Sequence, residues 1–524
     1  MALLLLPLEV LTQIIEETMP EGFVGIISTC KTVYHASGNL REKHNRLSRH
    51  YRDFNYTFEH HQDFSWHILS SLHLLSKIAD EPLIARYIVS ANFTLDRIPS
   101  GNTIQAHINH IKDSSNLLSL LERSPYLRST GIDPRSVLEY LISEYVADEV
   151  DSGLAPTLLL TLLPNVIELS LPAGWNSFNQ NLPDNIPCPI SSWLNDIVTR
   201  ANDPCDSSAG LSRLTTLLPS SRYHDHNENN WALSIYTPFL FIKTVENFFS
   251  GGCMVIDDNY TGIPFPDPRW ESFGAGLEVA GLFGAYFDGG KLQKFLSRLP
   301  KLRSLGLSYM TEWYDTGHVM DARAIMEAVE DAAGGTLELL SFTAYNFDGK
   351  IKRGVQSMKG FTKLTELELD MELLLSREGG EPDDSGEDEG GSKVPRLGDL
   401  LPPTIEWMCL RIYNDSPSSL RDLACLFSEV AIDKDEKLPN LNKIEIRYDN
   451  FQLAEPGLSS NAPSETSLWK GSTTDCSIPQ WQAELASLAS SVDIEYVSLR
   501  KRASLFYTRP FFQTCLDKRL LAES

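Results

Sequence analysis

The side chains that most resemble metal ligands lie in two short clusters. His60 and His61 are adjacent, and His224, Asp225 and His226 follow one another within a polar run. A metal site usually needs three or four ligands, each held in place by neighbouring groups. The polar surroundings of the second cluster are typical of a solvated loop, so we predict no metal site and no cofactor.

The sequence contains no recognisable motif for phosphate binding or nucleophilic catalysis. Gly274-Ala275-Gly276 is followed by Val279 where a dinucleotide-binding loop requires glycine, so these glycines are expected to allow close packing or a turn. No GxSxG or HExxH pattern occurs. We therefore predict that the chain is not an enzyme. Catalytic residues that converge only in the folded chain would escape this search, and an enzyme with such a site stays open as an alternative.

The charge balance argues against two classes of partner. The 524 residues include 70 acidic and 45 basic side chains, a net charge of −25. So acidic a chain is poorly suited to neutralising nucleic-acid phosphates or binding anionic membranes, and we predict neither partner. No run of 18 apolar residues could span a bilayer. The eight scattered cysteines form no CxxC pair, which predicts reduced thiols and a cytoplasmic and/or nuclear location.

The first 36 residues predict short helices with more apolar surface than they can bury alone. Leu8, Leu11, Ile14 and Ile15 have helical spacing, and Pro7 suits a first helical turn. The segment 19–22 breaks that helix, and further apolar residues follow up to Tyr34. Either the rest of the chain or a partner must cover these faces.

From about residue 156 an apolar-x-x-apolar-x-apolar template recurs. The last positions of this template are typical of a short strand, and the first packs in the bend before it. One such unit cannot cover its own apolar face, so units must stack into a parallel sheet with helices outside. An ordinary α/β domain with parallel strands remains the alternative. The matches begin at Val166, Leu302, Leu337, Leu364, Ile405 and Leu441, and four have proline two residues earlier, at 164, 300, 403 and 439.

Two further segments complete the predicted organisation. Residues 46–155 read as mainly helical, for example over 136–146. Residues 376–393 hold seven acidic residues and five glycines and no apolar side chain. Burial cannot offset the entropy of ordering such a segment, so we predict a disordered surface insertion.

The N-terminal segment resembles an F-box. Leu6-Pro7-Leu8-Glu9-Val10-Leu11 is followed by Ile14-Ile15 and then by residues 26–34, in the family's order. An F-box-like segment at the N-terminus, ahead of leucine-rich repeats, resembles the layout of F-box/leucine-rich-repeat proteins. The whole chain resembles the filamentous-fungal members of that family in particular. The fold class that follows is α/β: a small helical F-box, then an irregular leucine-rich-repeat-like solenoid with parallel strands inside and helices outside. The expected domains are an F-box (1–45), a helical linker or cap (46–155), repeats (156–500) and a C-terminal cap (501–524).

The resemblance implies a substrate receptor of an SCF-type ubiquitin ligase. The F-box would bind a Skp-type adaptor, and through it a cullin–RING ligase, while the repeats hold an unknown protein substrate. The positions that match adaptor-binding or supporting positions of the family are Leu6, Pro7, Leu8, Ile14, Ile15, Lys31, Val33 and Tyr34. A ligase-independent repeat scaffold, in which these helices only cap the repeats, is the alternative.

The substrate is expected on the strand face between the leucine positions. The outward-facing candidates there carry both signs of charge, so no substrate class follows. They are Arg303, Glu366, Glu368, Arg411, Tyr413, Lys443 and Glu445.

Overall fold

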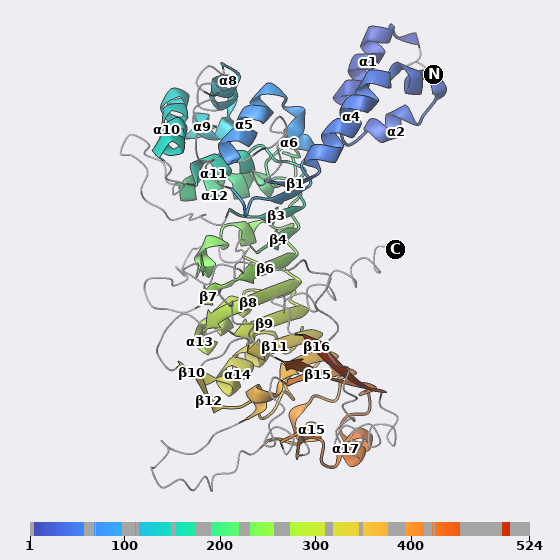
Figure 1. The fold of residues 1–524 in the computed structure, drawn as a ribbon, viewed down its shortest axis with the longest axis vertical. Helices are drawn as coiled ribbons and strands as arrows, with labels where there is room; N and C mark the ends of the chain where they lie inside the picture. Colours follow the sequence, from blue (N-terminus) through green and yellow to red (C-terminus); the bar gives the residue numbers. More distant parts are fainter. Residues whose placement is uncertain are drawn as a thin grey trace, which may run out of the picture. The chain divides into compact units, whose positions relative to one another are not determined.

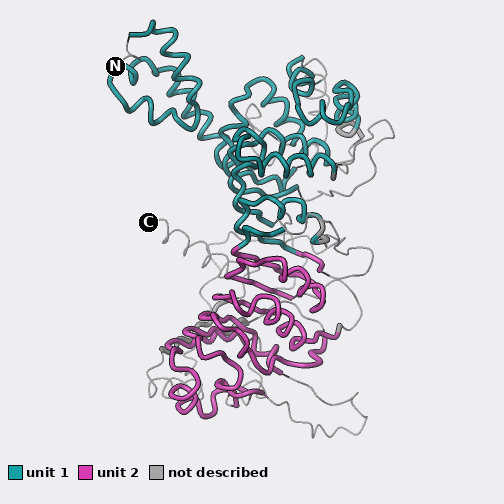
Figure 2. The backbone as a smooth tube through the Cα atoms, turned by 180° about the vertical axis from the view of Figure 1, so that it is seen from behind, with its two compact units in different colours: residues 1–251, 261–277 teal, residues 252–260, 278–524 magenta. Residues whose placement is uncertain are grey.

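The chain divides into two compact units, residues 1–251 with 261–277 and residues 252–260 with 278–524 (Figure 2). The computed structural model describes residues 5–56, 68, 70–96, 111, 115–147, 153–172, 190–219, 231–255, 273–309, 318–344, 349–375, 394–412, 422–423, 425–450 and 495–502. The acidic insertion 376–393, both histidine clusters, Tyr413 and most of the predicted C-terminal cap lie outside these residues.

Unit 1 combines short helices with a parallel sheet (Figure 1). Its strands β1, β2, β3, β4 and β6 are paired in this order, each parallel to the next. The strands are β1 (Asp53–Asn55), β2 (Ser90–Asn92), β3 (Glu168–Ser170), β4 (Thr216–Leu218), β5 (Trp231–Ala232) and β6 (Asn247–Gly251). The helices are α1 (Leu8–Glu17), α2 (Phe23–Ile27), α3 (Lys31–Ala36), α4 (Gly38–Tyr51), α5 (Ser71–Asp80), α6 (Leu83–Tyr87), α8 (Ser115–Arg123), α9 (Pro125–Thr130), α10 (Pro134–Ala147), α11 (Leu154–Leu160) and α12 (Ile190–Ala201), with 3₁₀ turns η3 (Leu233–Ile235) and η4 (Phe239–Phe241).

Unit 2 is a larger parallel sheet with helices. Strands β8, β9, β11, β13, β14, β15 and β16 are paired in this order, again all parallel. The strands are β7 (Cys253–Val255), β8 (Val279–Phe287), β9 (Ser304–Tyr309), β10 (His318–Asp321), β11 (Leu339–Ala344), β12 (Gly349–Arg353), β13 (Glu366–Asp370), β14 (Trp407–Ile412), β15 (Lys443–Asn450) and β16 (Glu495–Arg502). The helices are α13 (Gly289–Leu296), α14 (Ala322–Ala333), α15 (Leu397–Leu400) and α17 (Val430–Glu436), with the 3₁₀ turn η6 (Met371–Leu374). The predicted α/β class with parallel strands is therefore confirmed.

All six template matches become strands, and in unit 2 they align residue by residue. Leu305, Leu340, Leu367, Met408 and Ile444 occupy equivalent positions of neighbouring strands, and each is almost fully buried. The first template residue of each repeat is buried in the bend that precedes its strand, as predicted. Each fully buried leucine of this kind contributes about 1.5–3 kcal/mol relative to an exposed one.

One backbone arrangement recurs between neighbouring strands of each unit. In unit 2 the carbonyl of the residue preceding one strand accepts two N–H groups from the start of the next. Arg303 accepts from residues 338 and 339, Glu338 from 365 and 366, Thr365 from 406 and 407, and Glu406 from 442 and 443, at 2.8–3.1 Å and, for 443, 3.2 Å. In unit 1 the carbonyls of Arg52, Val89, Ile167 and Thr215 do the same. These shared carbonyls fix where each strand begins, and hence the register.

Strands β1 and β2 lie in the segment predicted as a helical linker. Each has only three residues, and the central one is Phe54 or Ala91 instead of the leucine, methionine or isoleucine of the six template matches. They form because their neighbours supply hydrogen bonds: the Arg52 carbonyl accepts from the N–H groups of Val89 and Ser90. Elsewhere in this segment the helical prediction is correct, since α10 covers 136–146.

The glycines at 274 and 276 have the structural role that was predicted. Gly274 has φ +59°, a conformation that favours glycine. A Cβ at Gly276 would lie 2.3 Å from the Lys243 carbonyl oxygen. Both therefore serve a tight turn.

Within the described ranges, no helix is both long and apolar enough to cross a membrane.

A half-buried carboxyl group fixes the start of α5. Asp96 Oδ1 accepts from the Ser71 N–H at 2.8 Å, and its other oxygen accepts from the Ser71 hydroxyl, which also contacts the Tyr56 hydroxyl at 2.9 Å. Burial raises the pKa of Asp96 from 3.8 to about 6, although the hydrogen bonds from Ser71 oppose this shift. The folded protein therefore binds this proton more tightly than the unfolded chain does.

We expect Asp96 to make the protein more stable as the pH falls from 7 to 4. Because its folded pKa lies above its unfolded value, wild type should gain about 2–3 kcal/mol relative to Asp96→Asn over this range. Urea unfolding of both proteins at several pH values measures this difference.

Asp133, at the start of α10, is the matched control, because its pKa is shifted in the opposite direction to that of Asp96. Hydrogen bonds from the Ser136 hydroxyl and backbone N–H lower the pKa of Asp133. Wild type should therefore lose stability relative to Asp133→Asn as the pH falls. A pH-independent difference between wild type and Asp96→Asn would contradict the assignment.

Candidate functional site

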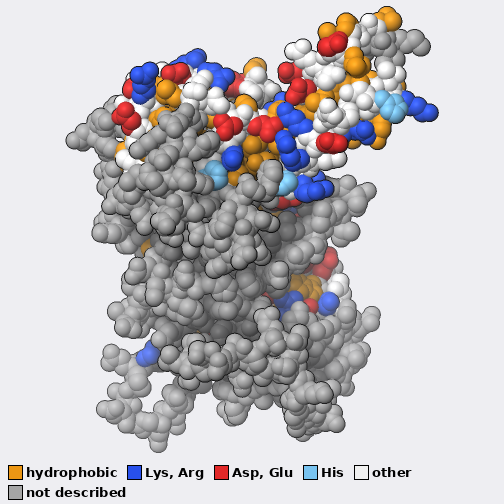
Figure 3. All heavy atoms as spheres, turned by 45° about the horizontal axis from the view of Figure 1, so that its top comes forward, with side chains coloured by type: hydrophobic (Ala, Val, Ile, Leu, Met, Phe, Trp, Pro, Cys, Tyr) orange, Lys and Arg blue, Asp and Glu red, His pale blue; other side chains and the backbone are white. Residues whose placement is uncertain are grey.

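Exposed apolar side chains are concentrated on the first three helices. Of the nine large hydrophobic side chains exposed among the described residues, six belong to residues 5–34. Leu8 and Val24 are each about 60% exposed. Figure 3 shows hydrophobic side chains at the surface of this helical segment. We call the six the N-terminal apolar surface: Leu5, Leu6, Leu8, Val10, Val24 and Tyr34.

The inner faces of the same helices are well packed. Leu11, Ile15 and Val33 are at most 3% exposed. Phe23 stacks on His44 of α4 with ring centroids 4.6 Å apart, and His44 Nδ1 lies 2.7 Å from the Tyr87 hydroxyl of α6. Burial lowers the pKa of His44 and raises that of Tyr87 to about 12, so both are neutral at pH 7. The inner side chains of these helices are thus well packed, while the apolar side chains on their outer face are exposed to solvent.

Ion pairs hold these helices against the rest of unit 1. Lys43 of α4 contacts Glu16 of α1 at 3.0 Å and Glu81 at 3.3 Å. Burial opposes the charged form of Glu21, but hydrogen bonds from Asn165 and Arg86 hold the pKa of Glu21 below its usual value. The N-terminal apolar surface is therefore presented by helices with fixed positions within this unit.

The predicted adaptor residues separate into two groups. Leu6, Pro7, Leu8, Lys31 and Tyr34 are exposed, and the Arg41 guanidinium lies over the Tyr34 ring, 3.8 Å from its centroid. The remaining three face inward and can only support the surface: Ile14 is half-buried, and Ile15 and Val33 are buried.

Sequence reasoning missed Leu5, Val10 and Val24 as members of this surface. The expected apolar stripe was Leu8, Leu11, Ile14 and Ile15, yet Leu8 is exposed. Val10 lies beside the buried Leu11, and Val24 beside the buried Phe23. A stripe of apolar residues wider than one helix face was the available signal.

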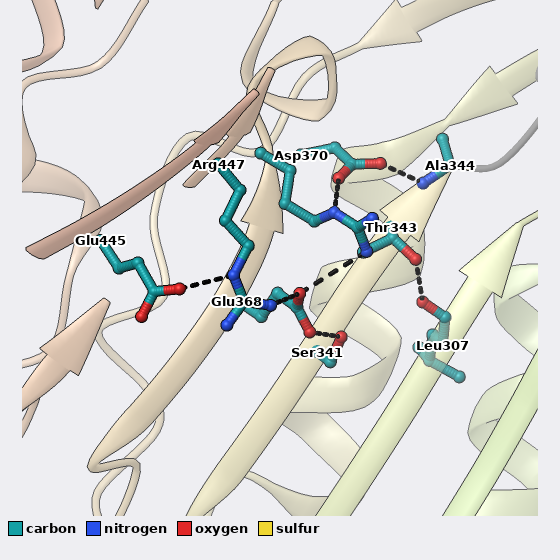
Figure 4. Close-up of polar contacts among 9 residues, drawn as sticks. Leu307, Ser341, Thr343, Ala344, Glu368, Asp370, Glu445 and Arg447 are labelled. Carbon is teal, nitrogen blue, oxygen red and sulfur yellow. Dashed lines mark hydrogen bonds and ion pairs between the residues drawn. The ribbon is translucent and has the colours of Figure 1, made fainter. Parts of the chain in front are cut away.

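The fold also brings charged side chains together in a cluster on β13, β14 and β15 (Figure 4). Glu368 Oε1 lies 3.5 Å from Arg411 Nη1 and 3.2 Å from Arg447 Nη1. Arg447 Nε donates to Glu445 at 2.6 Å, and Arg411 Nε lies 3.9 Å from Asp370. The two guanidinium groups partly compensate the three carboxylates, which leaves a formal charge of −1 on the five side chains.

Neighbouring donors and a thiol complete the cluster. The Ser341 hydroxyl donates to Glu368 at 2.7 Å, and the Ala344 N–H donates to Asp370. Cys409 lies between Glu368 and Glu445 in the strand register. Burial raises the pKa of the Cys409 thiol, and the Glu368 carboxylate adds to the effect. A protonated, buried thiol is a poor nucleophile, so the sheet holds Cys409 in its unreactive form.

Three predicted substrate-surface residues require correction. Glu368, Arg411 and Glu445 were expected to face outward, but all three are less than 8% exposed. Glu368 of β13 pairs with Arg411 of β14, and Glu445 pairs with Arg447 of its own strand, β15. Arg303 is exposed and pairs with Glu338 at 2.8 Å. Glu366 and Lys443 are half-buried at the beginnings of their strands. The described residues contain no group of three or more His, Cys, Asp or Glu side chains placed to bind a metal ion.

Removing Arg411 should destabilise the protein strongly. Arg411→Met leaves Glu368 and Asp370 buried without one of their cations, which should cost about 3–5 kcal/mol of unfolding free energy. Arg303→Met, at an exposed pair of the same sheet, should cost at most about 1 kcal/mol. Urea unfolding compares the two variants, and equal midpoints would contradict a stabilising role for the cluster.

Comparison with known proteins does not assign the chain to a family. No protein-family model matches the chain, and no curated protein matches it.

Proposed function

We propose that this protein is the substrate receptor of an SCF-type ubiquitin ligase. In this proposal α1–α3 form the F-box that binds a Skp-type adaptor, and the strands behind them belong to leucine-rich-repeat-like units that hold a protein substrate. The observation that carries the proposal is the N-terminal apolar surface, because exposed side chains of this kind gathered on positioned helices are typical of a protein-binding site.

Two further observations support the two halves of the proposal. The exposed members of the surface include Leu6, Leu8 and Tyr34, which match positions of the F-box pattern. The regular register of β9, β11, β13, β14 and β15 supports stacked repeats. Function would then be positional: the receptor raises the effective concentration of the substrate near the charged ubiquitin carrier and does no covalent chemistry itself.

Replacing the leading residues of the surface should release the adaptor. We expect Leu6→Ala/Pro7→Ala/Leu8→Ala to weaken adaptor binding by roughly a hundredfold or more, because apolar anchors carry most of the energy of such interfaces. Co-purification of the full chain with a recombinant fungal Skp adaptor, followed by titration, measures the effect.

The matched control is Ile432→Ala, which shortens another exposed apolar side chain, on α17 in unit 2. It should bind the adaptor as wild type does. If wild type never retains the adaptor, or if the triple variant retains it equally well, the proposal is wrong.

The contacts of Glu16 and Glu21 with the rest of unit 1 favour a second candidate, a ligase-independent repeat scaffold capped by these helices. In that case deletion of residues 1–40 lowers the melting temperature and spares partner binding. Adaptor retention by wild type separates the two candidates.

A further inference from the structure

Arg41, in the first turn of α4, lies against the N-terminal apolar surface. Its guanidinium carbon is 3.8 Å from the centroid of the Tyr34 ring, so it covers one face of this exposed side chain. Figure 3 shows basic side chains beside the hydrophobic ones on this helical segment. A partner that covers Tyr34 would therefore also lie next to the charge of Arg41.

The charge of Arg41 has no counter-ion among the residues that the structure describes. The side chain is half-buried, and its Nε is shielded from solvent without a hydrogen-bond acceptor. Two neighbouring basic side chains of α4 differ in this respect, since Lys43 contacts Glu16 at 3.0 Å and Arg46 lies 3.6 Å from Glu81. The Nη atoms of Arg41 carry the other four N–H donors of the guanidinium.

The position of Arg41 within α4 does not explain its charge either. The N-terminal end of a helix dipole disfavours a cation, and the first turn of α4 contains no acidic residue, whereas Arg49 and His50 occupy the favourable last turn. Glu42 is the next residue, but successive residues of a helix do not face each other. The charge of Arg41 therefore does not stabilise its own helix.

Covering the N-terminal apolar surface would remove water that now solvates the Arg41 guanidinium. Burying a charge without a partner is costly, so a purely apolar surface would bind poorly at this point. A carboxylate offsets this cost best, because its two oxygens match the fork of guanidinium donors.

We propose that the protein that covers the N-terminal apolar surface places the carboxylate of an aspartate or glutamate against Arg41. Apolar contacts supply most of the affinity, and the ion pair selects partners with a carboxylate at the matching position. That this partner is the Skp-type adaptor rests on the function proposed above. Arg41 is not among the positions that the resemblance to the F-box assigned to the adaptor.

The test titrates a recombinant fungal Skp adaptor into the full-length chain and its variants. Arg41→Gln should bind about thirtyfold more weakly than wild type, or worse, because the adaptor carboxylate is then buried without its partner. Arg41→Lys keeps the charge but loses the fork, so its affinity should fall between the two. Thermal melting by circular dichroism verifies that each variant is folded.

The matched control is Arg49→Gln, which removes the same charge from an exposed position of the same helix, about 12 Å further along its axis. It should change the affinity by less than about twofold, because screening confines charge effects to roughly 8 Å at physiological salt. Equal weakening by Arg41→Gln and Arg49→Gln would show that only the net charge matters, and would overturn the proposal.

A double-mutant cycle identifies the carboxylate. The aspartates and glutamates of the adaptor are replaced one at a time by asparagine or glutamine. One replacement should weaken binding to wild type and have almost no further effect on Arg41→Gln, as expected for directly paired groups. If Arg41→Gln binds weakly but couples to no adaptor carboxylate, Arg41 only orients the Tyr34 ring and the proposal is wrong.

The wild-type titration separates this proposal from the ligase function. If wild type and Arg41→Gln bind the adaptor equally well, the role of Arg41 is wrong while the ligase function stands. If wild type does not bind the adaptor at all, both proposals fail.

Discussion

The shared carbonyl before each strand is the constraint on which the rest of the fold depends. In unit 2, the carbonyls of Arg303, Glu338, Thr365 and Glu406 each accept two N–H groups from the next repeat, and unit 1 uses the same arrangement. Because these bonds fix where the strands that follow them begin, the apolar residues of successive strands fall into line. A slip of one residue would turn each buried leucine to the opposite face of its sheet.

The same register decides the electrostatics of the opposite face. Residues that alternate with the leucines stand opposite one another, so Glu368 faces Cys409 and Asp370 faces Arg411. Opposite charges at these positions partly compensate one another once they are buried, as Glu368 and Arg411 do. The charged residues at the beginnings of the strands, Glu366 and Lys443, are only half-buried.

The N-terminal helices differ from the sheet because one of their faces is packed against the rest of unit 1 and the other exposes apolar side chains. Phe23 and His44 stack inside, and Lys43 and Glu21 connect the helices to the rest of unit 1. Leu8 and Val24 remain exposed, although burying such side chains is favourable by about 1.5–3 kcal/mol each. Positioned helices that leave this free energy unused favour a partner on that side, which is the basis of the function proposed here.

By itself the sequence determined the six template strands, the helices α1 and α10 and a structural role for Gly274 and Gly276, because each depends on a local spacing of apolar or permissive residues. It did not reveal β1, β2 or β8: the first two have Phe54 and Ala91 where the six matches have leucine, methionine or isoleucine, and β8 is almost uniformly apolar. Exposed and buried charges also could not be told apart, since Glu368 meets Arg447 79 residues away. Only the tertiary structure decided which of Leu8 and Leu11 is exposed and where Glu368, Arg411 and Arg447 meet, because burial depends on neighbours that are distant in the chain.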